Sequence, residues 1–172
     1  MSLNTMEDLL VGQLTDLYGA VRMVTQVLPR MVEAAANERL AEAFRQQQAQ
    51  TNEQLARLEQ VFHFLGAHPR GRRCVGMAGL LREVGVRLTR GGNQALIDAG
   101  LITDARRVAH YEIAAYTSTI ALAETLGLGS IVRLLTFTLR EETAADERLS
   151  RIARNEVNPD GALVGAAVDL DG

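Results

Sequence analysis

The sequence predicts an all-α fold, an antiparallel bundle of four long helices. Apolar residues recur every three or four positions over several long stretches, which is the spacing of one helical face. Aromatic residues make up 4% of the chain, there is no Trp, and there are three Pro, a composition typical of aliphatic helix packing and unfavourable for an all-β fold. The 172 residues fit one domain with a hydrophobic core of its own.

The first helix is expected from residue 6 to about residue 35. Pro29 should kink it or begin a new turn, because a proline inside a helix removes a backbone donor. Its apolar face is formed by Leu10, Leu14, Leu17, Val21, Val24 and Leu28. A second helix of similar length is expected to begin after Asn37, a favourable capping residue, and to stop at Gly66.

The stretch from 66 to 92 reads as a long crossover that carries one short helix, placed by the apolar residues between Met77 and Leu88. A third long helix is expected from about Asn93 to the glycines at 127 and 129. The fourth should begin with Ser130 as its cap and end before Asn158. Residues 1–157 would then form the bundle, and residues 158–172 a loosely ordered tail.

Two helix hairpins joined by one long crossover are the ferritin-like arrangement of a four-helix bundle. The sequence therefore predicts a ferritin-like four-helix bundle with one extra short helix between helices two and three. The same pattern would serve a purely structural bundle, so the topology alone assigns no function.

Composition also narrows the class of protein. The formal net charge of -3 disfavours nucleic-acid binding, which normally needs a basic excess on one face. No apolar run approaches the roughly 20 residues of a membrane span, and the single Cys74 cannot form an intramolecular disulfide. We therefore expect a soluble, cytoplasmic protein. Arg70, Arg72 and Arg73 precede Cys74, and we expect a solvated loop there, with anion binding as the alternative.

Two acidic residues break the apolar pattern of their helices. Glu112 and Glu142 occupy positions at which core residues are expected. A buried carboxylate needs a cation, a hydrogen-bonding partner or a proton. In bundles of this topology, buried carboxylates commonly hold a pair of metal ions. Asp146 and Glu141 are close enough in sequence to join such a site, whereas His110 points away from Glu112 on the same helix.

Four segments resemble the blocks of the YciE/YciF family of bacterial ferritin-like proteins, a domain of unknown function. They are LTDLYGAVRMV at 14–24, QTNEQLARLEQVFHFLGAHPRGRRC at 50–74, AHYEIAAYTSTIALAETLG at 109–127 and LREETAADERLSRIA at 139–153. The resemblance covers roughly residues 6 to 155 in the same order. It implies a ferritin-like fold, a homodimer, a place for a metal pair and an association with bacterial stress, without an established substrate.

The chain departs from the family pattern at three presumed ligand positions. Val21 stands where the resemblance implies a Glu, Gln47 where it implies a His and Gln50 where it implies a Glu, while Glu112 and Glu142 are kept. Asp146 is kept as well. The residues left as metal ligands by this comparison are Glu112, Glu142 and Asp146, half of a site.

Neutral amides cannot replace anionic oxygens around two dications, so the sequence predicts a degenerate di-metal site. We expect no cofactor and no enzymatic activity. Glu112 and Glu142 would then accept hydrogen bonds from Gln47 and Gln50, or would share a proton. The alternatives are an iron or manganese protein with oxidase or peroxidase activity, and a purely structural dimeric bundle.

Overall fold

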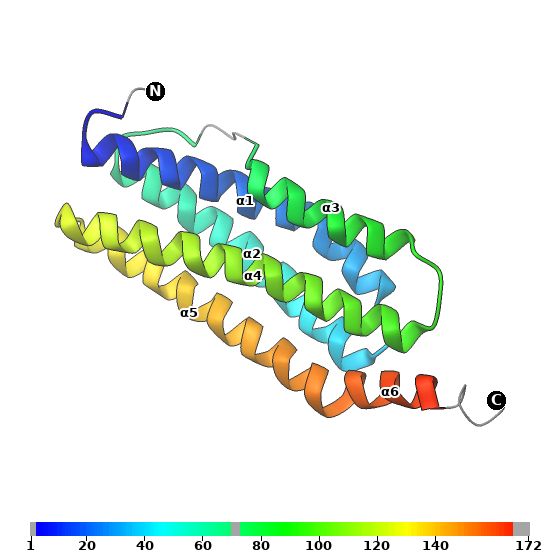
Figure 1. Ribbon diagram of the computed structural model, residues 1–172. Helices are drawn as coiled ribbons and strands as arrows, with labels where there is room; N and C mark the ends of the chain where they lie inside the picture. Colours follow the sequence, from blue (N-terminus) through cyan, green and yellow to red (C-terminus); the bar gives the residue numbers. More distant parts are fainter. Residues whose placement is uncertain (1–2, 70–72, 167–172) are drawn as a thin grey trace.

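The computed structural model describes residues 3–69 and 73–166, and every element within these ranges is helical (Figure 1). The four long helices are α1 (Met6–Ala34), α2 (Glu38–Phe64), α4 (Gln94–Thr125) and α5 (Gly129–Ile152). The crossover carries α3 (Val75–Thr89), and α5 is followed by the π-helical turn η1 (Ala153–Val157) and by α6 (Asn158–Ala166). The predicted ferritin-like four-helix bundle with an extra short helix is confirmed.

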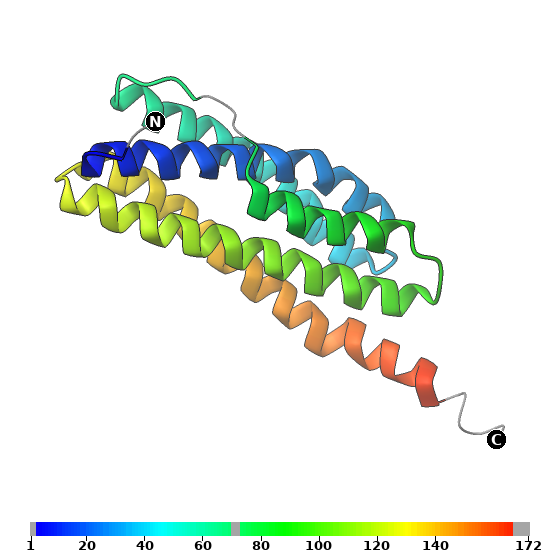
Figure 2. The same ribbon diagram turned by 45° about the horizontal axis from the view of Figure 1, so that its top comes forward.

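The long helices pack as two antiparallel hairpins. α1 packs against α2, and α4 against α5; the hairpins meet where α2 contacts α5 and α1 contacts α4. The crossover helix α3 lies along the outside of α1 and α4, as both ribbon views show (Figures 1 and 2). Within the described residues, no helix is both long and apolar enough to cross a bilayer.

The helix boundaries follow the capping residues with one exception. The Asn37 side chain accepts from the backbone N–H of Leu40, and the Asn93 side chain accepts at the start of α4, as expected. α1 continues through Pro29 as one helix. The prediction of Ser130 as a cap is wrong: α5 begins one residue earlier, and the Ser130 hydroxyl makes no capping bond.

The C-terminal segment differs from the predicted tail. Residues 158–166 form α6, and residues 167–172 lie outside the described residues. The expected stop at Asn158 and Pro159 fails because the helix continues without a break from α5 through the π-helical turn, in which the Asn158 N–H donates to the Ala153 carbonyl. Val157 is buried in the core, and the Cα of Gly161 faces Leu96, so the segment is packed against the bundle.

The core consists of two apolar clusters separated along the bundle by buried polar side chains. One cluster includes Val24, Leu28, Phe44, Leu101 and Leu149. The other includes Leu14, Val21, Phe62, Tyr116 and Leu135. Between them on α2, α4 and α5 lie the buried polar residues Gln47, Thr51, Gln54, Glu112, Thr138, Glu142 and Asp146. α1 contributes apolar residues to both clusters, so its inner face continues without interruption past this polar band.

One buried carboxylate joins the two hairpins near the α1–α2 link. Asp98 on α4 is 2% exposed, and its oxygens accept from the backbone N–H groups of Ala36 at 3.1 Å and Asn37 at 2.7 Å. Asp98→Ala should lower the free energy of unfolding by about 2–3 kcal/mol, because two backbone donors lose their partner. Urea denaturation followed by circular dichroism measures this loss. Glu124→Ala removes an exposed carboxylate from the same helix, and an equal loss in that control would contradict the assigned role.

Candidate functional site

The two carboxylates singled out from the sequence lie together in the polar band. Glu112 on α4 is 1% exposed and Glu142 on α5 is 2% exposed. They are close enough for the charge of Glu142 to oppose the ionisation of Glu112, which contributes to a raised Glu112 pKa. The helical spacing brings them there because each lies on the face that otherwise supplies core residues: Val108 and Tyr116 flank Glu112 one turn away on either side.

The hydrogen-bond partner of Glu142 is Gln54 on α2. The Gln54 side-chain amide donates to Glu142 Oε1 at 2.8 Å and to Glu141 Oε2 at 3.2 Å. Arg57, one turn further along α2, donates to Glu141 at 2.9 Å and to the hydroxyl of Thr138. Gln54 and Arg57 thus bind the Glu141–Glu142 pair from the facing helix and fix the orientation of both carboxylates.

The sequence pointed to other glutamines on the same helix. Gln47 is buried and Gln50 is half-buried, but among the described residues neither side chain donates to Glu112 or Glu142. The predicted hydrogen bonds from these two residues are therefore wrong. Gln54 lies seven residues after Gln47, a spacing of about two helical turns. This spacing places both side chains on the same face of α2. It is the sequence pattern from which Gln54 could have been predicted as a partner of the carboxylates.

Several oxygens in the band have no hydrogen-bond partner among the described residues. They are Glu112 Oε1, Glu142 Oε2, Gln54 Oε1 and the Tyr116 hydroxyl, all fully buried. Three of the four can only accept when the carboxylates are ionised, and the Tyr116 hydroxyl is the single potential donor among them. A proton on either carboxyl group would supply one, because a protonated carboxyl donates as well as accepts.

Burial and mutual repulsion favour that proton. Burial raises the pKa of Glu112 well above its ordinary value, and the charge of Glu142 raises it further. Burial also raises the pKa of Glu142 to about 7; the hydrogen bond from Gln54 opposes this shift and the charge of Glu141 adds to it. Burial and the neighbouring charge therefore both favour a protonated pair over two ionised carboxylates.

Asp146, the third predicted site residue, is directed elsewhere. Its Oδ1 accepts from Arg106 Nε at 2.8 Å and its Oδ2 from Arg106 Nη2 at 3.2 Å. His110 Nε2 lies 3.3 Å from the same Oδ2. Both carboxylate oxygens are thus bound by side chains of α4, and His110, which the sequence placed away from Glu112, contacts Asp146 instead.

The donor set does not fit a di-metal centre. Val21, at the position where the resemblance implies a Glu, is fully buried in an apolar cluster, so α1 offers no oxygen there. Among residues 3–69 and 73–166, no group of three or more His, Cys, Asp or Glu side chains is placed to hold a metal ion. Two glutamates from α4 and α5, without a carboxylate at position 21 of α1, supply too few anionic oxygens to balance two dications.

A separate polar contact surrounds the cysteine. Cys74 is buried at the start of α3, with its Sγ 3.0 Å from the hydroxyl of Tyr111 on α4, and this hydrogen bond is the largest cause that raises the pKa of Tyr111 to about 12. Gly76 leaves the space that the Tyr111 ring fills, since a Cβ there would lie 2.9 Å from the ring. The neighbouring Arg70 and Arg72 lie outside the described residues, so the predicted basic cluster stays a prediction.

Comparison with known proteins identifies relatives along nearly the whole chain. The family described as a domain of unknown function, DUF892, matches residues 5–162. Protein YciF of Escherichia coli K12 is 36% identical over 159 residues, which is 92% of this chain and 96% of that protein.

Solved structures of two relatives have the same fold as this chain. The crystal structure of the E. coli stress protein YciF superposes with a TM-score of 0.87 at 36% identity and covers 91% of this chain and 99% of that one. YcfI of Rhodopseudomonas palustris, whose description proposes a structural role, superposes with a TM-score of 0.84 at 40% identity and covers 87% of this chain and 97% of that one. The chain therefore belongs to the DUF892 family, the family of YciF.

Proposed function

We propose that this chain is a non-catalytic, stress-associated ferritin-like protein in which a proton-sharing carboxyl pair stands in place of a di-metal centre. The stress association is carried over from the description of YciF, which matches almost the full length of the chain. The description of YcfI supports a structural rather than a catalytic role. The bundle itself, and the surface it presents, would then be the functional unit.

The observation that carries this proposal is the hydrogen bond that the Gln54 side chain donates to Glu142. The Gln54 amide donates to Glu142 Oε1 at 2.8 Å, so one oxygen of this carboxyl group is bound by a protein donor at the place where a metal ion would otherwise bind. Asp146 is bound through both oxygens by Arg106, and Val21 offers no ligand. Val21 is thus apolar, Asp146 is held by Arg106 and one oxygen of Glu142 is held by Gln54, whereas Glu112 Oε1 and Glu142 Oε2 have no partner among the described residues.

We further propose that the protein acts as a homodimer in the cytoplasm. Phe137 on α5 is 56% exposed and lies under the guanidinium of Arg57, 4.5 Å from its ring centroid. In the proposed dimer, the exposed face of this ring would pack against the partner and leave water. This supports the dimer independently of the state of the carboxyl pair.

Elemental analysis tests the proposal for the site. Protein purified from cells grown with added iron and manganese should contain less than about 0.1 metal ion per chain, because the donor set lacks the charge to hold a pair. A content near two ions per chain would contradict the proposal. It would instead favour the metal-binding alternative with oxidase or peroxidase chemistry.

A further inference from the structure

The two exposed phenylalanines of the chain lie on the surface that α2 and α5 form together. Phe137 on α5 is 56% exposed, and the guanidinium of Arg57 on α2 lies 4.5 Å from its ring centroid. Phe64 is 60% exposed and lies seven residues after Arg57, about two turns along the same side of α2. The other two phenylalanines, Phe44 and Phe62, are fully buried. Phe64 and Phe137 therefore mark one surface, the α2–α5 face.

The α5 side of this face is basic. Arg140, Arg148 and Arg151 form no ion pair with another residue in the described part of the chain. Arg140 lies three residues after Phe137, on the same side of the helix. Arg148 and Arg151 line an open cavity between α2 and α5. Glu147 is the single exposed acidic residue between Arg140 and Arg151, so α5 keeps a net positive charge here.

The α2 side of the face is acidic. Glu53 lies one turn before Arg57, is exposed and has no ion-pair partner among residues 3–69 and 73–166. Glu42 lines the same cavity between α2 and α5. Arg45 is shared by Glu42 and Glu38, so one guanidinium serves two carboxylates. The face thus carries a net negative charge along α2 beside a net positive charge along α5.

Hydrogen bonds between the two helices show which of their residues lie at the same height. They join Gln54 to Glu142, Arg57 to Thr138 and Arg39 to Glu156. Because the numbers rise along α2 as they fall along α5, the two helices are antiparallel. Glu53 adjoins Gln54, and Arg140 lies between Thr138 and Glu142. Glu53 and Arg140 therefore lie within about one turn of the same height of the bundle.

We propose that the α2–α5 face binds a second copy of this chain through a twofold axis parallel to the helices. This inference rests on the homodimer proposed above and names its interface. Rotation about such an axis leaves every height unchanged and lays α2 of each copy over α5 of the other. Glu53 then faces Arg140 of the partner subunit, and Glu42 faces Arg151 of the partner subunit. Phe137 packs against the partner's α2 and leaves water.

The face is large enough for a stable dimer. α5 spans 24 residues, which at 1.5 Å per residue is about 36 Å, and two helices side by side are about 20 Å wide. Each copy would bury about 700 Å², and the total falls within the range of about 1,200–2,000 Å² of standard interfaces. Ala49, Ala56 and Ala144 are exposed small side chains that allow close approach. A nucleic acid on the same face would meet the carboxylates of Glu42 and Glu53, so the second copy is the better match.

Charge reversal tests the pairing across this axis. Glu53→Arg sets like charges opposite Arg140 twice in each dimer. It should raise the dissociation constant of the dimer at least about tenfold in sedimentation equilibrium of the full chain. Adding Arg140→Glu to Glu53→Arg restores opposite charges and should return the constant to within about threefold of the wild type. Glu33→Arg makes the same charge change at an exposed position of α1, outside the face, and should leave the constant unchanged.

Sedimentation separates a failure of the homodimer from a failure of this face. A wild-type chain that stays monomeric at every concentration would contradict the homodimer itself and this interface with it. A wild-type dimer that Glu53→Arg weakens no more than Glu33→Arg does would keep the homodimer and exclude the α2–α5 face. A double reversal that binds no tighter than Glu53→Arg would overturn the parallel axis. Binding of a fluorescein-labelled single-stranded oligonucleotide by the monomer, lost in Arg140→Glu, would assign the arginines of α5 to nucleic acid instead.

Discussion

Replacing Glu142 with glutamine is expected to stabilise the protein more at pH 8 than at pH 5, by about 2–3 kcal/mol in the free energy of unfolding. The pKa of Glu142 is raised to about 7 in the folded chain from a reference value of 4.5. Below pH 4.5 the carboxyl is protonated in both states, and its contribution to stability is fully present. As the pH rises through 7 the folded state must release the proton, so this contribution is lost. Glutamine does not titrate, and its carbonyl oxygen can still accept from Gln54.

Urea denaturation of both proteins at several pH values between 5 and 8 measures this effect. Glu147→Gln removes an exposed carboxylate from the same helix and should leave the pH dependence of the wild type unchanged. The raised pKa of Glu112 acts in the same direction, so Glu112→Gln should also reduce the loss of stability at high pH. A stability difference between Glu142→Gln and the wild type that is the same at pH 5 and pH 8 would show that no proton is held by this carboxyl.

The periodicity of the sequence predicted the parts of the site that depend on one helix at a time. Glu112 and Glu142 were found because each interrupts an apolar face, and a buried face follows from a spacing of three and four residues. Val21 was correctly placed in the core for the same reason. The parts that depend on how two helices face each other were not predicted.

The partner of Glu142 is the clearest example of that second kind. Gln47, Gln50 and Gln54 lie on neighbouring turns of α2, and only the axial register between α2 and α5 decides which of them reaches the carboxylate. The orientation of the Asp146 side chain on α5 likewise depends on its hydrogen bond with Arg106, which lies on α4. Side-chain length and rotamer choice across a helix interface leave no periodic signal in the sequence.

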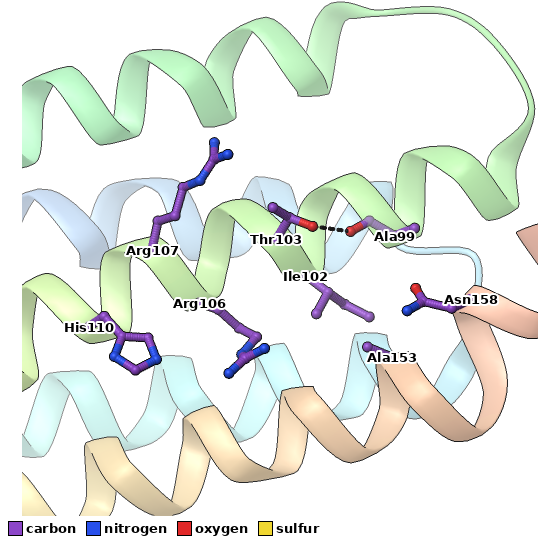
Figure 3. A pocket seen from close by; sticks show the side chains of 8 residues that line it. All are labelled: Ala99, Ile102, Thr103, Arg106, Arg107, His110, Ala153 and Asn158. Atoms are coloured by element: carbon purple, nitrogen blue, oxygen red, sulfur yellow. Dashed lines mark hydrogen bonds between the residues drawn. The ribbon is translucent and has the colours of Figure 1, made fainter.

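The end of the fold was missed for a local reason. Asn158 followed by Pro159 is a common helix stop, but the chain widens into a π-helical turn just before it and continues as α6. A π-turn has no strong sequence signature, so residues 158–172 were predicted to be a tail. The turn and Asn158, the first residue of α6, face α4 across a cavity (Figure 3).

The absence of an oxygen donor on α1 leads to the second large expected effect, the restoration of metal binding. The double substitution of Val21→Glu and Gln54→Glu would add two carboxylates to Glu112 and Glu142 in the polar band. Without metal, the added buried charges should lower the free energy of unfolding by about 3–5 kcal/mol. Manganese at about one hundred times its dissociation constant should restore about 3 kcal/mol, because it binds the folded chain and not the unfolded one.

Urea denaturation with and without manganese measures this recovery, and elemental analysis of the folded variant counts the ions. Leu14→Glu provides the matched control, because Leu14 is as fully buried as Val21 on the same helix but lies seven residues, about two turns, further from the polar band. That variant should lose as much stability and recover none of it with manganese, since no second carboxylate faces the new one. A double variant that manganese does not stabilise would show that carboxylates at positions 21 and 54 do not complete a metal site with Glu112 and Glu142. The native chain would then tolerate its two buried glutamates through a shared proton and the hydrogen bond from Gln54, without reference to a metal site.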